Sequence, residues 1–261
     1  MEKVAIVTGG SSGIGSCVAR RLSGEGYRVY EFSRSGTGEE GILHIDCDVS
    51  SSGSVRSAVD AVIARENRLD LVINCAGFGI SGAIEHTETS DAKRQFDVNF
   101  FGTAEVNKAC IPSLKKTKGR IINISSVAAL AAIPFQAYYS ACKAAVNSYT
   151  LALANELKPF GVSVCAVMPG DTATGFTSAR NKSTEGDEDY GGRISKSVAK
   201  MEKDERKGVS PDTVAKLICN IAAKEKVKPL YTAGLDYKLI IVLLKILPYS
   251  LSNKLISLLY G

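Results

Sequence analysis

The chain has 261 residues, a net charge of +5, seven cysteines and two histidines, and its length suits one α/β domain because no low-complexity linker or internal repeat divides it. The basic residues are mixed with acidic ones and lack interleaved aromatic residues, and the cysteines form no C-x-x-C pair, so we expect neither a nucleic-acid partner nor a metal site. Cysteines in apolar surroundings, and a strand that starts directly after Met1 without a signal peptide, predict a cytoplasmic protein.

Strand and helix patterns alternate along the chain, as is typical of a doubly wound parallel sheet. We expect strands near residues 3–8, 28–33, 41–47, 69–74, 119–124, 162–167 and 229–232. We expect helices near residues 14–25, 55–66, 90–117, 136–158 and 211–224. Pro112 should kink or end the third of these helices early, because proline lacks the backbone N–H that a helix interior needs. The predicted fold is a Rossmann-like α/β domain with a parallel seven-stranded sheet.

A glycine-rich turn, Thr8–Gly15, links the first predicted strand to the first predicted helix. Glycines there allow the backbone to approach a pyrophosphate, which would lie at the positive N-terminus of the helix. The spacing is G-x-x-x-G-x-G, and the alternative is a strand-helix connection that binds no ligand. The cofactor-binding residues predicted in this turn are Gly9, Ser11, Ser12, Gly13, Ile14 and Gly15.

Tyr139 and Lys143 are four residues apart, so both lie on the same face of the predicted 136–158 helix. An ammonium close to a phenol favours the ionised form and lowers the phenol pKa from its usual value near ~10. A tyrosine and a lysine at this spacing also occur by chance on many solvated helices, so the pair alone is a weak signal. Ser126, which lies upstream at the end of a predicted strand, strengthens it.

Together these motifs resemble those of a short-chain dehydrogenase/reductase of the common single-domain type, and the resemblance extends from Lys3 to about Thr232. The motifs that carry it are the turn at residues 8–15, Asp48-Val49, Asn74-Cys75-Ala76-Gly77, Asn99, Ser126, Tyr139 with Lys143, and Pro169-Gly170. The resemblance implies that Tyr139 is the general acid/base and that Ser126 stabilises the developing charge on the substrate oxygen. It implies that Lys143 lowers the phenol pKa and binds the nicotinamide ribose. Asn99 would interrupt its helix and hold a proton-relay water, although the sequence alone favours a place on a helix surface.

The end of the second strand favours NADP(H) over NAD(H). A cofactor without the extra phosphate usually meets a carboxylate there. Ser33 instead leaves room for a 2′-phosphate, which Arg34 can bind bidentately. Glu31 is the counter-signal, because a slipped strand register would bring it to the ribose. The remaining predicted cofactor contacts are Asp48 and Val49 at the adenine, Asn74, Ala76 and Gly77 beside the adenine ribose, and Pro169, Gly170, Thr172 and Thr174 at the nicotinamide.

The substrate is expected to be a lipophilic ketone or secondary alcohol. The candidate pocket residues are largely apolar and comprise Val127, Leu130, Ile133, Phe135, Phe176 and Tyr190. Residues 172–208 are rich in charge and glycine, which predicts a mobile lid within a catalytic domain over residues 1–234. Asp171 is unusual for the family and could cap the next helix or reach toward the substrate.

Residues 235–261 form an apolar helical extension of the same domain, with helices expected over 235–247 and 251–260. Neither reaches the roughly 20 apolar residues needed to span a bilayer. The extension could pack over the pocket, meet a partner subunit, or touch a membrane surface through its apolar stretch and flanking lysines. Such tails resemble those of steroid- and retinoid-acting members, which implies a hydroxysteroid-like substrate.

Two other functions compete with this oxidoreductase. A 3-oxoacyl-thioester reductase would need a basic docking surface at the pocket mouth, where Glu185–Asp189 is acidic. A non-catalytic NADP(H)-sensing protein would gain nothing from having Ser126, Tyr139 and Lys143 together. The family's usual dimer surface, built from the 90–117 and 136–158 helices, implies a homodimer.

Overall fold

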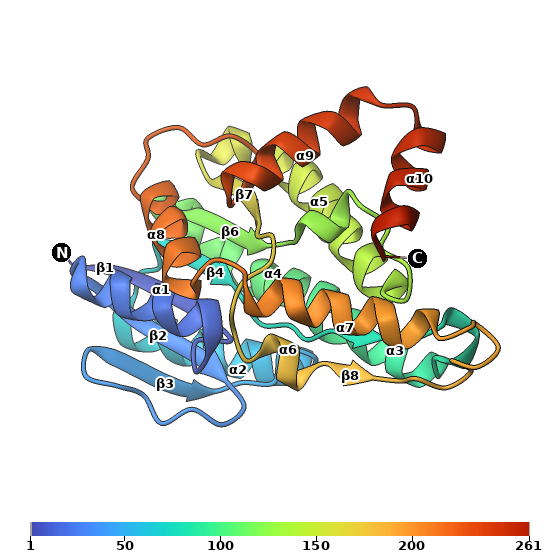
Figure 1. The fold of residues 1–261 in the computed structure, drawn as a ribbon. Coiled ribbons are helices and arrows are strands. Elements are labelled where there is room, and N and C mark those ends of the chain that lie inside the picture. The colour runs from blue at the N-terminus through green and yellow to red at the C-terminus, as the bar shows by residue number, and fades with distance from the viewer. Residues whose placement is uncertain (1, 261) are drawn as a thin grey trace.

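The computed structural model describes residues 2–260, and all of their side chains except those of Leu235 and Lys245. Its centre is a seven-stranded parallel sheet in the order β3-β2-β1-β4-β6-β7-β9 (Figure 1). The strands are β1 (Lys3–Thr8), β2 (Tyr27–Ser33), β3 (Ile42–Asp46), β4 (Leu71–Asn74), β6 (Arg120–Ile124), β7 (Ser163–Met168) and β9 (Leu230–Thr232). The predicted fold class and all seven predicted strands are confirmed.

Helices cover both faces of this sheet (Figure 1). On one face lie α1 (Gly13–Gly24) and α8 (Pro211–Ala222), which pack on each other. On the other lie α2 (Ser52–Glu66), α4 (Gly102–Thr117) and α5 (Ala137–Leu157). The chain adds strands outward from β1 to β3 and then returns to β4 on the other side of β1, which creates a switch point. Ligands of doubly wound sheets bind at this point, beyond the carboxyl ends of the strands.

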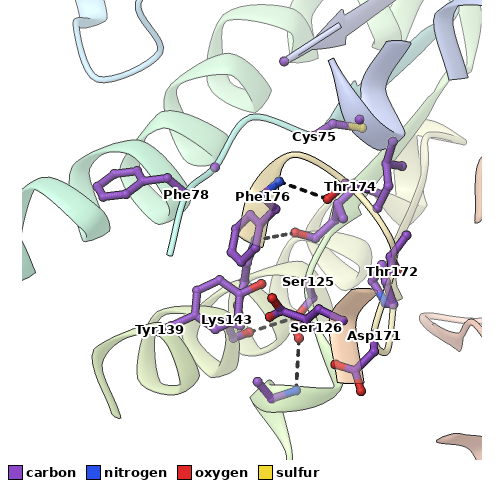
Figure 2. A pocket seen from close by; sticks show the side chains of 18 of the residues that line it. Cys75, Phe78, Ser125, Ser126, Tyr139, Lys143, Asp171, Thr172, Thr174 and Phe176 are labelled. Atoms are coloured by element: carbon purple, nitrogen blue, oxygen red, sulfur yellow. Dashed lines mark hydrogen bonds between the residues drawn. The ribbon is translucent and has the colours of Figure 1, made fainter. Parts of the chain in front are cut away.

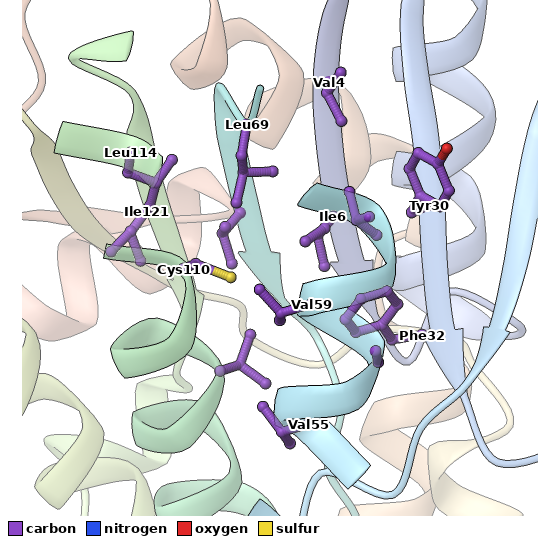
Figure 3. Packing of buried hydrophobic residues seen from close by; sticks show 14 of the residues in the cluster. Val4, Ile6, Tyr30, Phe32, Val55, Val59, Leu69, Cys110, Leu114 and Ile121 are labelled. Atoms are coloured by element: carbon purple, nitrogen blue, oxygen red, sulfur yellow. The ribbon is translucent and has the colours of Figure 1, made fainter. Parts of the chain in front are cut away.

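The sheet is held by apolar side chains that pack on both of its faces. The strands are rich in valine and isoleucine, and Ile6 and Ile121 are completely buried. Figure 3 shows the face covered by α2 and α4, where Val59 lies near Ile6 and where Leu114 lies near Ile121. Burying such a side chain stabilises the fold by about 1.5–3 kcal/mol. This packing fixes the strand ends from which the candidate site is built.

Of the two effects predicted for Pro112, a kink or an early end of its helix, the early end is wrong. The helix α4 continues through Pro112 to Thr117. The proline lies on the exposed face of the helix, where water can bond the carbonyl group that lacks an N–H partner. The interruption falls earlier, at a π-helical turn over Asp97–Phe101 that separates α3 (Thr89–Phe96) from α4.

The segment over residues 172–208 contains elements that the sequence did not predict. These are α6 (Phe176–Ala179), β8 (Asn181–Lys182) and α7 (Arg193–Arg206). The strand β8 pairs with β5 (Ile80–Ser81) in a separate two-stranded sheet. The buried face of α7 follows helical spacing through Ile194, Val198 and Met201, and this period was the signal that would have found the helix.

The C-terminal extension forms two helices, α9 (Leu235–Ile246) and α10 (Tyr249–Tyr260). In Figure 1 these two helices, here called the C-terminal hairpin, lie at the edge of the molecule with a sharp bend between them, and α10 packs on α7. Two apolar helices were predicted here, and the structure has them one after the other with Pro248 between them.

Replacing Pro112 with alanine should stabilise the protein. The substitution provides a backbone N–H group that can donate to the Lys108 carbonyl. Alanine is also favoured over proline in a helix interior by about 3 kcal/mol. Loss of the proline also raises the conformational entropy of the unfolded chain, which reduces the gain in stability to about 2 kcal/mol. Urea unfolding of Pro112→Ala measures this change. The control is Lys116→Ala at another exposed position of α4, and an unchanged or lower stability for Pro112→Ala contradicts the prediction.

Candidate active site

A cavity of about 470 Å³ lies beyond the carboxyl ends of β1, β4, β6 and β7 (Figure 2). It brings together most of the residues predicted as site residues from distant parts of the sequence. Those that line it are Gly9, Ser12, Gly13, Ile14, Gly15, Ala76, Gly77, Ser126, Tyr139, Lys143, Pro169, Gly170, Thr172 and Thr174. The predicted residues Ser11, Ser33, Arg34, Asp48, Val49, Asn74 and Asn99 do not line it.

The glycine-rich turn forms a cradle that larger residues would fill. Gly9 has a φ angle of +64°, and a Cβ on it would lie 2.9 Å from the Ala76 backbone. A Cβ on Gly15 would lie 2.2 Å from the carbonyl oxygen of Gly9. The side chain of Ser12, the residue before α1, makes no capping hydrogen bond, so the first N–H groups of that helix can bind an anion. The turn therefore fits the pyrophosphate of a dinucleotide.

Tyr139, Lys143 and Ser126 face the cavity (Figure 2). Tyr139 and Lys143 come from successive turns of α5, and the Lys143 Nζ lies 5.7 Å from the centre of the Tyr139 ring. The Lys143 ammonium also donates a hydrogen bond to the Ile124 carbonyl at 2.8 Å. Ser126 follows β6, and its Oγ accepts from the Ala128 N–H at 3.1 Å, which leaves the hydroxyl hydrogen for another acceptor.

Ser125, the neighbour of Ser126, has a structural role. Its hydroxyl donates to the backbone carbonyl of Lys143 at 3.1 Å. Its side chain is therefore committed to holding α5 against the end of β6. This supports the choice of Ser126 as the residue that meets a substrate oxygen.

Burial controls the ionisation of this site. It raises the pKa of Tyr139 to about 12, and the interaction with the Ser126 hydroxyl offsets only part of the rise. Burial also lowers the pKa of Lys143. Without a bound cofactor the phenol pKa therefore moves opposite to the direction expected from Lys143, because desolvation of the phenolate outweighs the lowering effects of the Ser126 hydroxyl and the Arg180 charge. Tyr139 is protonated at neutral pH and can donate a proton.

Asn99 is not on a helix surface, as the sequence alone favoured. It lies in the π-helical turn and is 1% exposed. Its amide nitrogen donates to the Phe78 carbonyl at 2.8 Å, and its Oδ1 accepts from the Phe78 N–H at 3.0 Å. The helix interruption implied by the family resemblance is confirmed. The side chain fixes the backbone of Phe78, which lines the cavity, while the relay water stays a prediction.

The end of β2 borders a smaller cavity of about 130 Å³ that Ser11 and Glu31 line. Glu31 stays within the strand, in register with Val7 of β1, so the slipped register does not occur. Its buried carboxylate is hydrogen-bonded to the His44 ring. Burial lowers the pKa of His44, but the bonds to Asp46 and Glu31 outweigh it and raise the pKa overall. Arg34 is exposed just beyond the strand.

Two predicted adenine-side residues make hydrogen bonds within the protein. Asn74 is buried below the cavity, and its amide nitrogen donates to Asn107 Oδ1 at 2.7 Å and to Asn123 Oδ1 at 2.9 Å. It supports the end of β4 from within the core, so it does not line the cavity as predicted. Asp48 accepts from the Ser50 N–H at 2.9 Å, as an aspartate that opens a turn does. These bonds hold the pKa of Asp48 below its usual value.

The substrate side of the cavity is only partly as predicted. Val127, Ile133 and Phe176 line it, and the Phe176 ring centre lies 5.6 Å from that of Tyr139. Phe135 and Tyr190 instead belong to an apolar cluster with α7. The remaining candidate, Leu130, is exposed.

The cavity also contains two carboxylates, Asp171 and Glu205. Asp171 accepts a hydrogen bond from the Tyr237 hydroxyl of α9, so it neither caps a helix nor stands free. Burial raises the pKa of Asp171, against the lowering effect of this bond. Glu205 of α7 accepts from the Thr177 hydroxyl at 2.6 Å and pairs with the buried Arg180. Sequence reasoning missed Glu205, because no local motif marks a residue on an unpredicted helix.

Comparisons with known proteins cover most of the chain. The short chain dehydrogenase family model matches residues 3–185. A 3-ketodihydrosphingosine reductase of Bacteroides thetaiotaomicron is 42% identical over 227 residues, which are 85% of this chain and 84% of that protein. The structure of a short-chain dehydrogenase from Streptomyces avermitilis is 27% identical with a TM-score of 0.83, over 92% of this chain and 91% of that one. The structure of ElxO with NADP bound is 26% identical with a TM-score of 0.75, over 91% of this chain and 99% of that one.

Tyr139 should remain protonated in alkaline solution when the protein is alone. Its pKa of about 12 follows from burial. An ultraviolet titration of the wild type, minus that of Tyr139→Phe, should therefore show no phenolate below about pH 10, where a free tyrosine is half ionised. Tyr138→Phe, a change in the neighbouring residue, is the control for general loss of a tyrosine. A difference signal near neutral pH would mean that Lys143 dominates the phenol pKa after all.

Proposed function

Because the chain belongs to the short-chain dehydrogenase family, an NAD(P)-dependent oxidoreductase family acting on CH–OH groups, we propose that it uses NADP(H) to reduce a ketone on a long-chain lipophilic substrate. The observation that carries the proposal is one cavity that holds the glycine-rich turn, Ser126, Tyr139 and Lys143 together. Its walls on the substrate side are apolar, apart from two carboxylates.

Each residue of the site has its own role in carbonyl reduction. When bound, the nicotinamide cofactor supplies the hydride. Tyr139, protonated at neutral pH, donates its proton to the carbonyl oxygen as that oxygen gains electrons. Ser126 donates its hydroxyl hydrogen to the same oxygen and stabilises the charge that develops there. Lys143 places a positive charge beside the phenol, and this charge stabilises the phenolate that remains after proton transfer.

The preference for NADP(H) is supported by the side chains around the end of β2. Ser33 ends the strand without a carboxylate, and the exposed Arg34 follows it. Glu31, the only opposing feature in this stretch of the sequence, is buried and bonded to His44. ElxO, which has the same fold, was solved with NADP bound.

The substrate class is proposed from the lining of the cavity together with the Bacteroides relative. The reductase from that organism is named for 3-ketodihydrosphingosine, a long-chain ketone with an amino group next to the carbonyl. Val127, Ile133 and Phe176 offer apolar surface for a chain. Asp171 and Glu205 place two carboxylates in the same cavity. Glu205 is paired with Arg180, so Asp171 is the carboxylate that we propose meets a cationic amino group. A hydroxysteroid has no such group, so the hydroxysteroid-like substrate stays a prediction in second place.

A homodimer also belongs to the proposal. The helices α4 and α5, which form the usual dimer surface of the family, carry exposed apolar residues. Leu151 of α5 is 39% exposed, and Phe101 at the start of α4 is 54% exposed. Light scattering of the purified protein measures the mass directly, and a monomer would contradict this part of the proposal.

Turnover of a substrate panel tests the reaction. NADPH consumption should be fastest with a long-chain 2-amino-3-ketone, compared with a ketosteroid and a 3-oxoacyl thioester. Tyr139→Phe should lower the rate by about 10²–10⁴-fold, because it removes the proton donor, whereas Tyr138→Phe should retain it. Preference for the steroid or the thioester would replace the proposed substrate class. Tight NADPH binding without turnover of any of the three would favour a sensing protein.

Arg34→Ala tests the cofactor. Loss of charge-assisted bonds to a 2′-phosphate costs about 1.5–3 kcal/mol, so the affinity for NADPH should fall by roughly 10–150-fold while that for NADH stays nearly unchanged. Titration calorimetry with each cofactor measures both affinities. Arg56→Ala, at an exposed position of α2, is the matched control. An equal loss for NADH and NADPH would mean that Arg34 does not bind the phosphate.

A further inference from the structure

The C-terminal hairpin, residues 235–260, exposes a row of apolar side chains on each of its two helices. On α9 the outward residues follow helical spacing, and those with this spacing are Leu239, Val242, Leu243 and Ile246, exposed by 72%, 55%, 50% and 75%. On α10 a second outward row consists of Leu251, Leu255, Leu258 and Leu259, exposed by 44%, 37%, 75% and 57%. Large exposed apolar patches of this kind mark binding surfaces for proteins or membranes.

The opposite sides of both helices are fixed to the rest of the molecule. On α9 the Tyr237 ring lies against Gly170, and Ile241 is buried. On α10 Ile256 is buried, and the Tyr260 ring lies 5.2 Å from the Lys200 ammonium of α7. The hairpin thus packs on the rest of the molecule through one face, and its outward rows are exposed to solvent in the folded protein.

Positive charge lies on the same two helices as these apolar rows. Residues 224–261 contain six lysines and two acidic residues, so they hold most of the net charge of +5. Lys238 of α9 and Lys254 of α10 are exposed and flank the two rows. Lys224, Lys226 and Lys228 lie between α8 and β9, at the amino edge of the sheet, where Arg120 at the start of β6 donates to the Lys224 carbonyl.

We propose that the hairpin docks this protein on the surface of an anionic phospholipid bilayer. The apolar rows would enter the interfacial layer with the helices lying along it, and the lysines would meet the acidic headgroups. In the described part of the chain, no helix is both long and apolar enough to cross a membrane, so the contact is peripheral. A second copy of this chain is a poorer occupant, because a two-fold interface brings the same lysine-rich surfaces together.

The docked hairpin lies next to the candidate active site. Tyr237 donates to Asp171, which lines the cavity. At the other end of the hairpin, Tyr260 packs on a cluster that contains Phe135 and Ile133, and Ile133 also lines the cavity. A long-chain substrate that partitions into the bilayer would therefore reach the cavity along the hairpin. This last step rests on the proposed function, whereas docking itself does not.

Vesicle co-sedimentation tests the proposal. The purified full chain is mixed with vesicles of phosphatidylcholine alone or with added phosphatidylglycerol. The wild type should bind the anionic vesicles at least ten-fold more strongly than the neutral ones. The double variant Leu243→Asp/Ile246→Asp should lose at least ten-fold in binding to the anionic vesicles. Lys238→Glu/Lys254→Glu should lose a similar factor on anionic vesicles only.

Matched controls separate docking from damage to the fold. Ile84→Asp introduces the same change at a residue that is 60% exposed outside the hairpin, and it should bind vesicles like the wild type. Thermal unfolding and light scattering without lipid are measured for every variant. The proposal is overturned if the wild type ignores anionic vesicles or if Ile84→Asp loses as much binding as the hairpin variant. It is also overturned if Leu243→Asp/Ile246→Asp converts an oligomer into a smaller species, because a second copy then covers the hairpin.

A soluble substrate keeps this test independent of the proposed reaction. NADPH consumption with a short water-soluble ketone, measured without vesicles, should be unchanged in the hairpin variants. If the wild type binds vesicles but reduces no ketone, the proposed function fails and docking stands. If it reduces the ketone but does not bind vesicles, docking fails and the proposed function stands.

Discussion

The site depends on one constraint: the strands of the large sheet are parallel, so all of their carboxyl ends lie at the same edge. Residues that directly follow β1, β4, β6 and β7 therefore meet around one cavity, although the first and the last of them are more than a hundred positions apart in the sequence. The glycines of the first turn keep this space open, since a Cβ on Gly15 would strike the Gly9 carbonyl oxygen. The helix α5 then supplies Tyr139 and Lys143 from a buried face, and Ser125 bonds that helix to the end of β6. The strand direction thus sets the place of the chemistry, and local hydrogen bonds set its orientation.

The electrostatic character of the cavity follows from burial more than from any single pair of charges. Desolvation raises the phenol pKa and lowers the ammonium pKa, so both groups resist ionisation in the protein alone. Ligand charges in such a place act with little screening. The carboxylates of Asp171 and Glu205 reach the same space, each with a partner of its own. The cavity therefore combines apolar side chains with two carboxylates near the proton donor, and under the proposed function these carboxylates would favour a substrate with a cationic group.

Much of the fold and of the arrangement of the candidate site could be predicted from the sequence, because the signals were local. Apolar runs marked the strands, and short spacings marked the glycine-rich turn and the Tyr139–Lys143 pair. The errors concern residues whose surroundings are tertiary. Pro112 was expected to kink or end a helix, yet the helix continues past it, because its exposed position lets water replace the missing bond. Asn74 was expected at the cofactor, yet two other asparagines bind it in the core. Glu205 and the helix α7 were missed because that segment has few apolar residues among many charged ones, so their helical spacing is hard to recognise.

The contact between Gly170 and Tyr237 has a consequence for exchanging parts between relatives. A Cβ at position 170 would lie 2.1 Å from the Tyr237 ring, so the loop after β7 and the tail are shaped to each other. The tail cannot be treated as an appendage that is trimmed or grafted at will. A chimaera that receives its last helices from another family member would need a matching loop at residues 170 and 171. Without that loop, a bulkier side chain would push α9 away and leave Asp171 without its tyrosine, directly beside the place where hydride transfer is proposed.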